Sequence, residues 1–134
     1  MKISAKTEYA MRAMVRIASQ DGQTTLGQIA GREGIPLTII HTIVHSLAKG
    51  GLVRTSRGRG GGVALARPAG RITARQILEA IEGKITLQRC MDMVENCPQG
   101  DGCAMKALLV RAEHRLAEVF ESTTLAELCA ANSN

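Results

Sequence analysis

Short apolar series alternate with glycine-containing breaks in the first part of the chain. Apolar side chains with a helical period fall on one face of residues 6–20: Tyr9, Ala10, Ala13, Met14, Ile17 and Ala18. Thr25 and Gln28 form the capping-box signature of a helix start, and Gly34 favours the end of that helix. A third apolar series follows a tight turn and stops at Gly50 and Gly51. Two short helices joined by a glycine turn predict a helix-turn-helix over about residues 25–49.

Two stretches after this unit have the alternating polarity of short strands. They read LVRTSR and VALAR, and the glycines between them supply the backbone freedom that a hairpin turn requires. The pattern predicts a two-stranded wing over about residues 52–67. Arg57, Arg59 and Gly60 would form a tip able to approach a phosphate or enter a minor groove. A solvated hairpin with a basic tip is the alternative for this stretch.

Helical signals return after the wing. Thr73 and Gln76 form a capping box before ITARQILEAIEG places Ile77, Leu78 and Ile81 on one face. A long helix over residues 103–122 has an apolar seam at coiled-coil spacing, composed of Met105, Leu109, Ala112, Leu116 and Val119. We predict that this seam mediates dimerisation, with packing against the chain's own core as the alternative. A further capping box precedes a last short helix that reaches to about residue 130.

These elements predict a mainly α fold with a small β-hairpin wing. Residues 1–83 would form a winged helix-turn-helix DNA-binding domain. Residues 84–134 would form a cysteine-loop sensor followed by the dimerisation helix.

The charge of the chain is unevenly distributed. The 134 residues have a formal net charge of +5, yet residues 34–78 contain seven Lys or Arg and no Asp or Glu. Such clustering indicates a polyanionic partner. One Tyr, one Phe and no Trp leave almost nothing on which single-stranded bases could stack, which favours duplex DNA. No P-loop, carboxylate pair or nucleophilic triad is recognisable, so we expect a protein that is not an enzyme.

The N-terminal sequence gives an expectation for location. Glu8, Arg12 and Arg16 interrupt its apolar series, which does not suit a signal peptide, and no apolar run is long enough to span a membrane. We therefore expect a cytoplasmic protein without a membrane partner. In a reducing compartment the four cysteines would be ligands, sensors or buried thiols rather than disulfides.

Three of the cysteines are grouped. Cys90, Cys97 and Cys103 have C-x6-C-x5-C spacing across a loop that ends at the start of the long helix, where the helix dipole favours a thiolate. An iron-sulfur cluster, a zinc ion and thiol or disulfide sensing are all compatible with this spacing. Cys129 stands apart, and we expect it to be a buried inert thiol.

Taken together, these motifs resemble the Rrf-type winged-helix transcriptional regulators, a family that includes IscR-, NsrR- and RirA-like proteins. The resemblance covers nearly the whole chain and rests on KTEYAMRAM, GIPLTIIHTIVHSLAKGGLV, RGRGGGVALARP, ITARQILEAIEG, the three-cysteine loop and STTLAEL. It implies a homodimer that binds a double-stranded DNA operator. It also implies that Cys90, Cys97 and Cys103 hold an iron-sulfur cluster, either 2Fe-2S or 4Fe-4S.

The resemblance also bears on a fourth ligand. IscR-like proteins use a histidine three residues after the last cysteine, but Lys106 occupies that position in this chain. NsrR-like proteins use a carboxylate in the first helix, contributed across the dimer, and this position corresponds to Glu8. The alternative for Glu8 is an exposed carboxylate that the helix dipole favours.

The predicted recognition helix departs from the commonest family pattern. His41 stands where many members have a glutamate that accepts from cytosine, and His45 follows one turn later. Such a pair could bind zinc, but we expect it to face DNA or solvent. The predicted groove contacts are Thr38, His41, Thr42 and His45, with Arg57 and Arg59 from the wing.

The combined prediction is a DNA-binding regulator whose operator affinity depends on an iron-sulfur cluster. A small diffusible signal such as nitric oxide or oxygen, or iron and cluster status, would act on that cluster. One alternative is a cluster-free regulator that responds to thiol oxidation or zinc. The other, from a different class, is a metal-handling or electron-transfer protein whose basic face binds an acidic partner.

Overall fold

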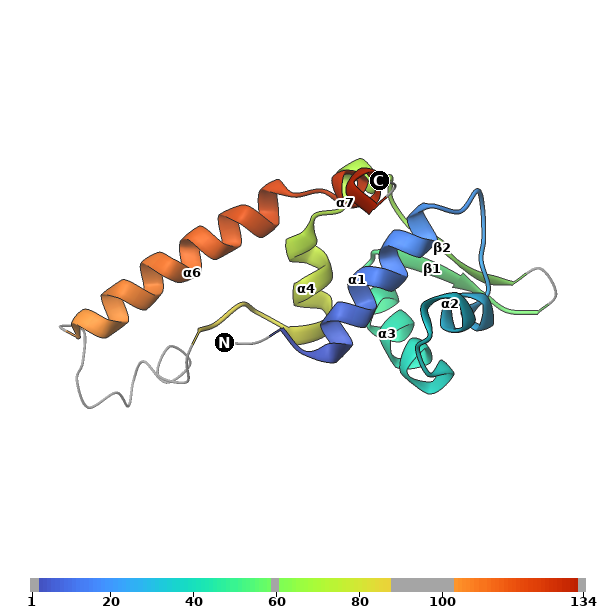
Figure 1. The fold of residues 1–134 in the computed structure, drawn as a ribbon, viewed down its shortest axis with the longest axis horizontal. Helices are drawn as coiled ribbons and strands as arrows, with labels where there is room; N and C mark the ends of the chain where they lie inside the picture. The colour runs from blue at the N-terminus through green and yellow to red at the C-terminus, as the bar shows by residue number, and fades with distance from the viewer. Residues whose placement is uncertain (1–2, 59–60, 88–102, 133–134) are drawn as a thin grey trace.

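The computed structural model describes residues 3–58, 61–87 and 103–132 of the chain. Its elements follow one another in this order (Figure 1): α1 (Ala5–Ala18), α2 (Leu26–Glu33), α3 (Leu37–Lys49), β1 (Val53–Ser56), β2 (Gly62–Leu65), the 3-10 turn η1 (Ala69–Arg71), α4 (Ala74–Glu82), α6 (Ala104–Ser122) and α7 (Leu125–Asn132). The predicted class, mainly helical with a β-hairpin wing, is confirmed.

The helices begin and end where local chemistry dictates. Thr25 and Thr73 both close capping boxes with the glutamine three residues later. Thr124 does the same with Glu127 at the start of α7. Gly34 ends α2 in the left-handed region at φ 65°, which a residue without a side chain adopts at little cost. Gly34 thus begins the short turn between α2 and α3, and the helix-turn-helix is confirmed.

The wing is an antiparallel hairpin in which Val53 pairs with Leu65 and Ser56 with Gly62. A third segment joins it, because Val63 donates to the carbonyl of Thr24 at 2.8 Å and accepts from its amide at 3.1 Å. Thr24 immediately precedes the N-cap of α2. The hairpin is therefore hydrogen-bonded to the start of the helix-turn-helix.

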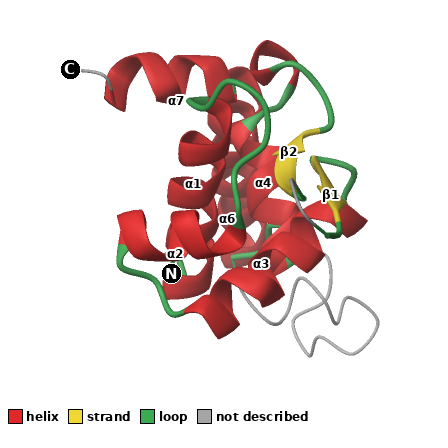
Figure 2. Ribbon diagram, turned by 90° about the vertical axis from the view of Figure 1, so that its right-hand side faces the viewer, coloured by secondary structure: helices red, strands yellow, loops and turns green. Residues whose placement is uncertain are grey.

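One hydrophobic core lies among α1, α3, α4 and the base of the wing (Figure 2). Met14 of α1, Ile40 and Leu47 of α3, and Ile77 of α4 are fully buried in it. Ile81, predicted to be buried, is only partly covered. The core positions α3 with one face inward and one face outward.

The long helix α6 extends away from this body (Figure 1). Its C-terminal end is attached by a short antiparallel bridge, in which Ala74 donates to the carbonyl of Thr123 and Leu125 to that of Ile72, both at 2.8 Å. Leu125 then returns α7 to the core, where it is fully buried. No described helix is long and apolar enough to cross a membrane.

Candidate DNA interface and sensor residues

The outward face of α3 is a continuous polar stripe. Thr38, His41, Thr42 and His45 are all exposed, at the spacing that places side chains on one side of a helix. The opposite face is buried and consists of Ile40, Ile43, Val44 and Leu47. The structure thus brings the four predicted groove contacts of this helix onto one surface.

The chemistry of this stripe suits nucleic acid. No Asp or Glu occurs in α3, and Lys49 in its last turn adds a positive charge. The hydroxyl of Thr42 donates to the carbonyl of Thr38 at 3.2 Å, while both imidazoles have ring nitrogens that can donate or accept. A surface that offers hydrogen-bond donors and carries no carboxylate suits the base edges and phosphates of a major groove.

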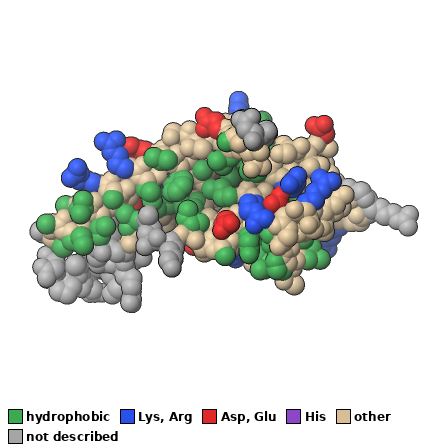
Figure 3. All heavy atoms as spheres, viewed as in Figure 1, with side chains coloured by type: hydrophobic (Ala, Val, Ile, Leu, Met, Phe, Trp, Pro, Cys, Tyr) green, Lys and Arg blue, Asp and Glu red, His purple; other side chains and the backbone are tan. Residues whose placement is uncertain are grey.

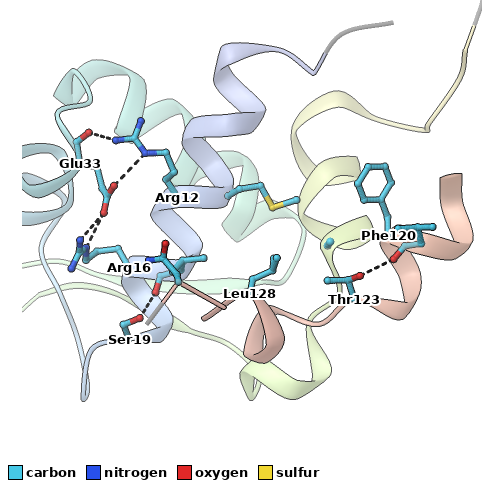
Figure 4. A pocket seen from close by; sticks show the side chains of 12 residues that line it. Arg12, Arg16, Ser19, Glu33, Phe120, Thr123 and Leu128 are labelled. Carbon is cyan, nitrogen blue, oxygen red and sulfur yellow. Dashed lines mark hydrogen bonds and ion pairs between the residues drawn. The ribbon is translucent and has the colours of Figure 1, made fainter. Parts of the chain in front are cut away.

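Two arginines of α1 hold α2, the first helix of the helix-turn-helix, in place. The carboxylate of Glu33, at the end of α2, lies 3.3 Å from Arg12 Nε and 2.9 Å from Arg16 Nη2 (Figure 4). Arg12 also donates to the backbone carbonyl of Glu33. These bonds satisfy a helix C-terminus with cations, which the helix dipole favours. They orient α2 and its turn into α3, and no local sequence pattern pairs Glu33 with α1.

The wing projects its polar residues outward. Val53 is buried in β1, whereas Arg54, Thr55 and Ser56 are exposed, and Arg57 beyond them is exposed as well. Arg59 and Gly60, predicted for the tip, lie outside the described residues. The described part of the wing therefore presents two arginines to solvent at the edge of the helix-turn-helix.

The start of the wing's second strand has a strict steric requirement. A Cβ added at Gly62 would lie 2.3 Å from the carbonyl oxygen of Thr24. The backbones approach this closely because Val63 and Thr24 exchange hydrogen bonds. Glycine at this position is thus needed for the hairpin to reach the start of α2.

The predicted metal ligands are only partly in view. Cys103 is the N-cap residue of α6 and a half-buried free thiol. Glu8 is exposed in the first turn of α1. Cys90 and Cys97 lie outside the described residues. Within residues 3–58, 61–87 and 103–132, no three His, Cys, Asp or Glu side chains gather closely enough to hold a metal ion.

What the structure shows of these donors is compatible with iron. Cys103 precedes the first turn of a nineteen-residue helix, and its side chain makes no capping hydrogen bond. Its sulfur is therefore not committed to the helix, while the helix N-terminus favours the negative charge of a coordinated thiolate. Cys129, by contrast, packs against the core, with its sulfur 3.9 Å from the carbonyl oxygen of Val15.

The apolar seam of α6 is only partly covered by the described part of the chain. Met105 and Val119 are 58% and 61% exposed, Leu108 beside the seam is 56% exposed, and no residue of the helix is buried. Hydrophobic side chains accordingly show along α6 in the space-filling view (Figure 3). Leu109 and Leu116 of the seam are half-buried, and none of the seam side chains is fully buried against the described part of the chain.

A cleft of about 590 Å³ continues this apolar surface onto the body (Figure 4). Its apolar walls are formed by α1, α6 and α7 with the side chains Met11, Val15, Val119, Phe120 and Leu128. Arg12, Arg16 and Glu33 close one end. The cleft and the α6 seam together provide an apolar surface that a helix of a second subunit could cover.

Electrostatic contacts join α4 to its neighbours. Ser4 and Thr7 at the start of α1 donate hydroxyl hydrogen bonds to Glu82 at the end of α4, and these bonds lower the pKa of Glu82. Arg75 lies 3.0 Å from Glu79, whose carboxylate raises the pKa of Arg75, and 3.9 Å from Glu121 of α6. The end of α4 is thus connected to α1, and its start is connected to α6.

Known proteins resemble the chain over nearly all of its length. Residues 3–131 match the model of the Rrf2 family, described as iron-dependent transcriptional regulators. The HTH-type transcriptional regulator IscR of Xenorhabdus nematophila is 36% identical over 130 residues, which cover 96% of this chain and 79% of that protein. The corresponding protein of Yersinia enterocolitica is 35% identical over the same length.

Solved structures agree with the sequence comparisons. The structure of CymR, the global cysteine regulator of Bacillus subtilis, superimposes with a TM-score of 0.81 at 30% identity and covers 98% of both chains. The structure of T. potens IscR gives a TM-score of 0.79 at 27% identity and covers 98% of this chain and 88% of that one. The protein described here is therefore a winged-helix transcriptional regulator that belongs to the Rrf2 family.

Proposed function

We propose that the protein is a homodimer that reads a two-fold symmetric DNA operator. The observation that carries this proposal is the polar stripe of α3, which lies opposite a fully buried face and next to a basic wing. In a dimer each α3 would enter a major groove, and the two half-sites would lie about one helical turn, roughly 34 Å, apart. Thr38, His41, Thr42 and His45 would contact bases and nearby phosphates.

The wing would add contacts beside each half-site. Arg57 is exposed next to the hairpin turn, and we propose that Arg59 and Gly60 share its role. Arginine follows a narrow minor groove well because that groove has an enhanced negative potential. These contacts would strengthen binding mainly through the backbone, whereas α3 would supply most of the base preference.

The sensor in this proposal is an iron-sulfur cluster. Cys90, Cys97 and Cys103 would hold it, with Glu8 of the other subunit as a fourth ligand. Three thiolates suit iron, and a carboxylate is a harder and weaker partner. Such a site would leave one iron comparatively open to nitric oxide or oxygen. The cluster, when bound, would supply the redox chemistry by which the protein responds to these molecules.

The observed connections support a proposed route from the sensor to DNA. Cys103 begins α6, whose far end is bridged to α4 through Thr123 and Ala74. Glu8 belongs to α1, which packs against α3. A change at these ligands would shift the separation of the two recognition helices. A coupling free energy of about 1 to 3 kcal/mol would change operator affinity roughly 5- to 150-fold.

Anaerobic purification tests the ligand set. We expect a coloured protein containing iron and sulfide, and we expect Cys97→Ala to lose the colour. Glu8→Ala should weaken retention of iron in air more than it reduces the initial colour. Iron retained equally well by Glu8→Ala and by the wild type would place the fourth ligand elsewhere.

A cluster-free regulator is the second candidate. CymR, described as the global cysteine regulator of B. subtilis, superimposes as well as IscR does. The fold is therefore compatible with more than one kind of signal. In that case the anaerobically purified protein would be colourless, and operator binding would respond to oxidation of Cys103 or to zinc. The same purification separates the two candidates.

A further inference from the structure

A shallow groove separates the start of α1 from the outward face of α3. It has a volume of about 330 Å³ and is lined by Lys6, Tyr9, Thr38, Ile39 and Thr42. Lys6 and Tyr9 are three residues apart and therefore lie on the same side of α1. Thr38 and Thr42 belong to the polar stripe of α3. The groove thus continues the stripe onto another helix.

The side chains that line this groove are complementary to an anion. Lys6 supplies a positive charge, and the phenol of Tyr9 and the hydroxyl of Thr38 supply neutral donors, whereas the hydroxyl of Thr42 donates to the carbonyl of Thr38. None of the lining residues is acidic. Glu8 lies about 200° around the helix from Lys6, on the other side of α1.

We propose that Lys6 and Tyr9 bind a backbone phosphate of DNA beside the strand that α3 reads. This inference rests on the proposed function, because it places α3 in a major groove. When α3 lies in the major groove of DNA, the start of α1 beside it meets the sugar-phosphate backbone that flanks the major groove. The partner is therefore the DNA backbone itself, and the contact is independent of base sequence.

The groove is held in shape by packing behind it. Tyr9 packs against the hydrophobic core, and Arg12 lies over its ring at 5.8 Å from the centroid. Arg12 is itself fixed by Glu33 at the end of α2. The phenol therefore has little freedom to lose on binding, which lowers the entropic cost of a contact.

The first turn of α1 is anchored to α4. The hydroxyl of Thr7, a fully buried residue, donates to the carboxylate of Glu82, and so does that of Ser4, the N-cap residue of α1. Lys6 also lies close enough to Glu82 to help lower the pKa of that carboxyl. Glu82 is the acidic group that acts on Lys6 from a neighbouring helix. It accepts two hydroxyl hydrogen bonds, from Ser4 and Thr7.

Salt dependence of DNA binding tests the proposal. The anaerobically purified wild-type protein selects its operator from a randomised duplex library, and affinities for that operator and for a scrambled duplex are then measured from 50 to 200 mM salt. Removing one phosphate contact reduces the slope of log affinity against log salt by about one. We expect Lys6→Gln to show this reduced slope and to bind both duplexes about 3- to 10-fold more weakly at low salt. Lys6→Arg should retain the wild-type slope.

Tyr9→Phe separates the neutral donor from the charge. Loss of one hydrogen bond should weaken binding to both duplexes by about 2- to 10-fold without changing the slope. Lys84→Gln is the matched control, since it removes a positive charge from an exposed residue that lines none of this groove. Thermal unfolding of each variant identifies any loss that is due to stability.

Two results would overturn the inference. Lys6→Gln with the wild-type slope, or with no larger effect than Lys84→Gln, would show that no phosphate is bound. Inorganic phosphate that competes with DNA at constant ionic strength, in the wild type but not in Lys6→Gln, would support a phosphate site in the groove. If the wild type selects no sequence, the proposed function fails, while the slope on random duplex still decides the role of Lys6.

Discussion

The winged-helix body and α6 differ in how far their own chain covers their apolar side chains. Among the residues that the structure describes, every buried hydrophobic one except Leu125 lies between Ala10 and Leu78, and α6 contains none. The body therefore fixes the shape of its DNA-reading face within one subunit. In the proposed dimer, the separation of two such faces would depend on α6 and its seam. A signal at the start of α6 could thus alter operator binding without unfolding the part that reads DNA.

Disrupting the α6 seam should have the largest effect. Met105→Glu with Val119→Glu places charges on two exposed apolar side chains, which would oppose burial against a second subunit. We expect a monomer by analytical ultracentrifugation. Operator affinity should fall by about 100-fold or more, because two linked half-site contacts become one.

Ala107→Glu provides the control for this pair, since Ala107 is exposed on α6 but lies away from the seam. It should remain a dimer with wild-type affinity. A double variant that still dimerises and binds the operator would assign dimerisation to another surface.

A substitution inside the body sharpens the comparison. Gly62→Ala places a Cβ 2.3 Å from the Thr24 carbonyl, so the wing must separate from the start of α2. We expect the free energy of unfolding to fall by about 1 to 3 kcal/mol, with dimerisation through α6 retained. Chemical denaturation monitored by circular dichroism measures this change.

Gly27→Ala is a suitable control, because Gly27 lies within α2 and a Cβ there meets nothing within 4 Å. It should be neutral or stabilising, since alanine favours helices by up to about 1 kcal/mol over glycine. Equal loss of stability in both variants would show that the steric requirement at Gly62 is not the cause.

The stripe of α3 offers a change in specificity rather than in stability. An imidazole can donate to guanine, whereas a carboxylate accepts from cytosine. His41→Glu should therefore change the preferred base at one position of each half-site by about 1 to 3 kcal/mol. Binding to a set of duplexes with each base at each position measures the change, and an unaltered preference would remove His41 from base reading.

The smallest expected effect is on stability at acidic pH. The pKa of Glu82 is lowered by the Ser4 and Thr7 hydroxyls, so its contribution to stability is present above the usual glutamate pKa of 4.5 and is lost as pH falls through its lowered value in the folded state. Because the carboxylate is exposed, this contribution is small. Glu82→Gln should reduce the loss of stability below pH 4.5, measured by thermal unfolding. An unchanged acid dependence would contradict the role of this contact between α1 and α4.

Sequence patterns predicted local structure well. The capping boxes at Thr25 and Thr73, the turn at Gly34 and the exposed stripe containing His41 all depend on residues within a few positions of one another. Helical period and cap chemistry determine such features directly. The apolar seam of α6 was predicted on the same basis; Met105 and Val119 are exposed, and the role of the seam in dimerisation stays a prediction.

Contacts between distant segments could not be predicted in this way. The bonds of Arg12 and Arg16 to Glu33, and the groove formed by Lys6 and Tyr9 with α3, arise only when α1 packs across the helix-turn-helix. In the sequence Lys6, Arg12 and Arg16 are ordinary polar positions on an amphipathic helix, and Tyr9 belongs to its apolar face. Their partners depend on the crossing of the helices, which periodicity does not specify.

Operator affinity before and after removal of iron from one anaerobic preparation is the most direct measurement. The account predicts a change of roughly 5- to 150-fold for the selected operator, and little change for a scrambled duplex. Equal operator affinity in the two states, from a protein that did contain iron and sulfide, would contradict control of DNA reading by the cluster.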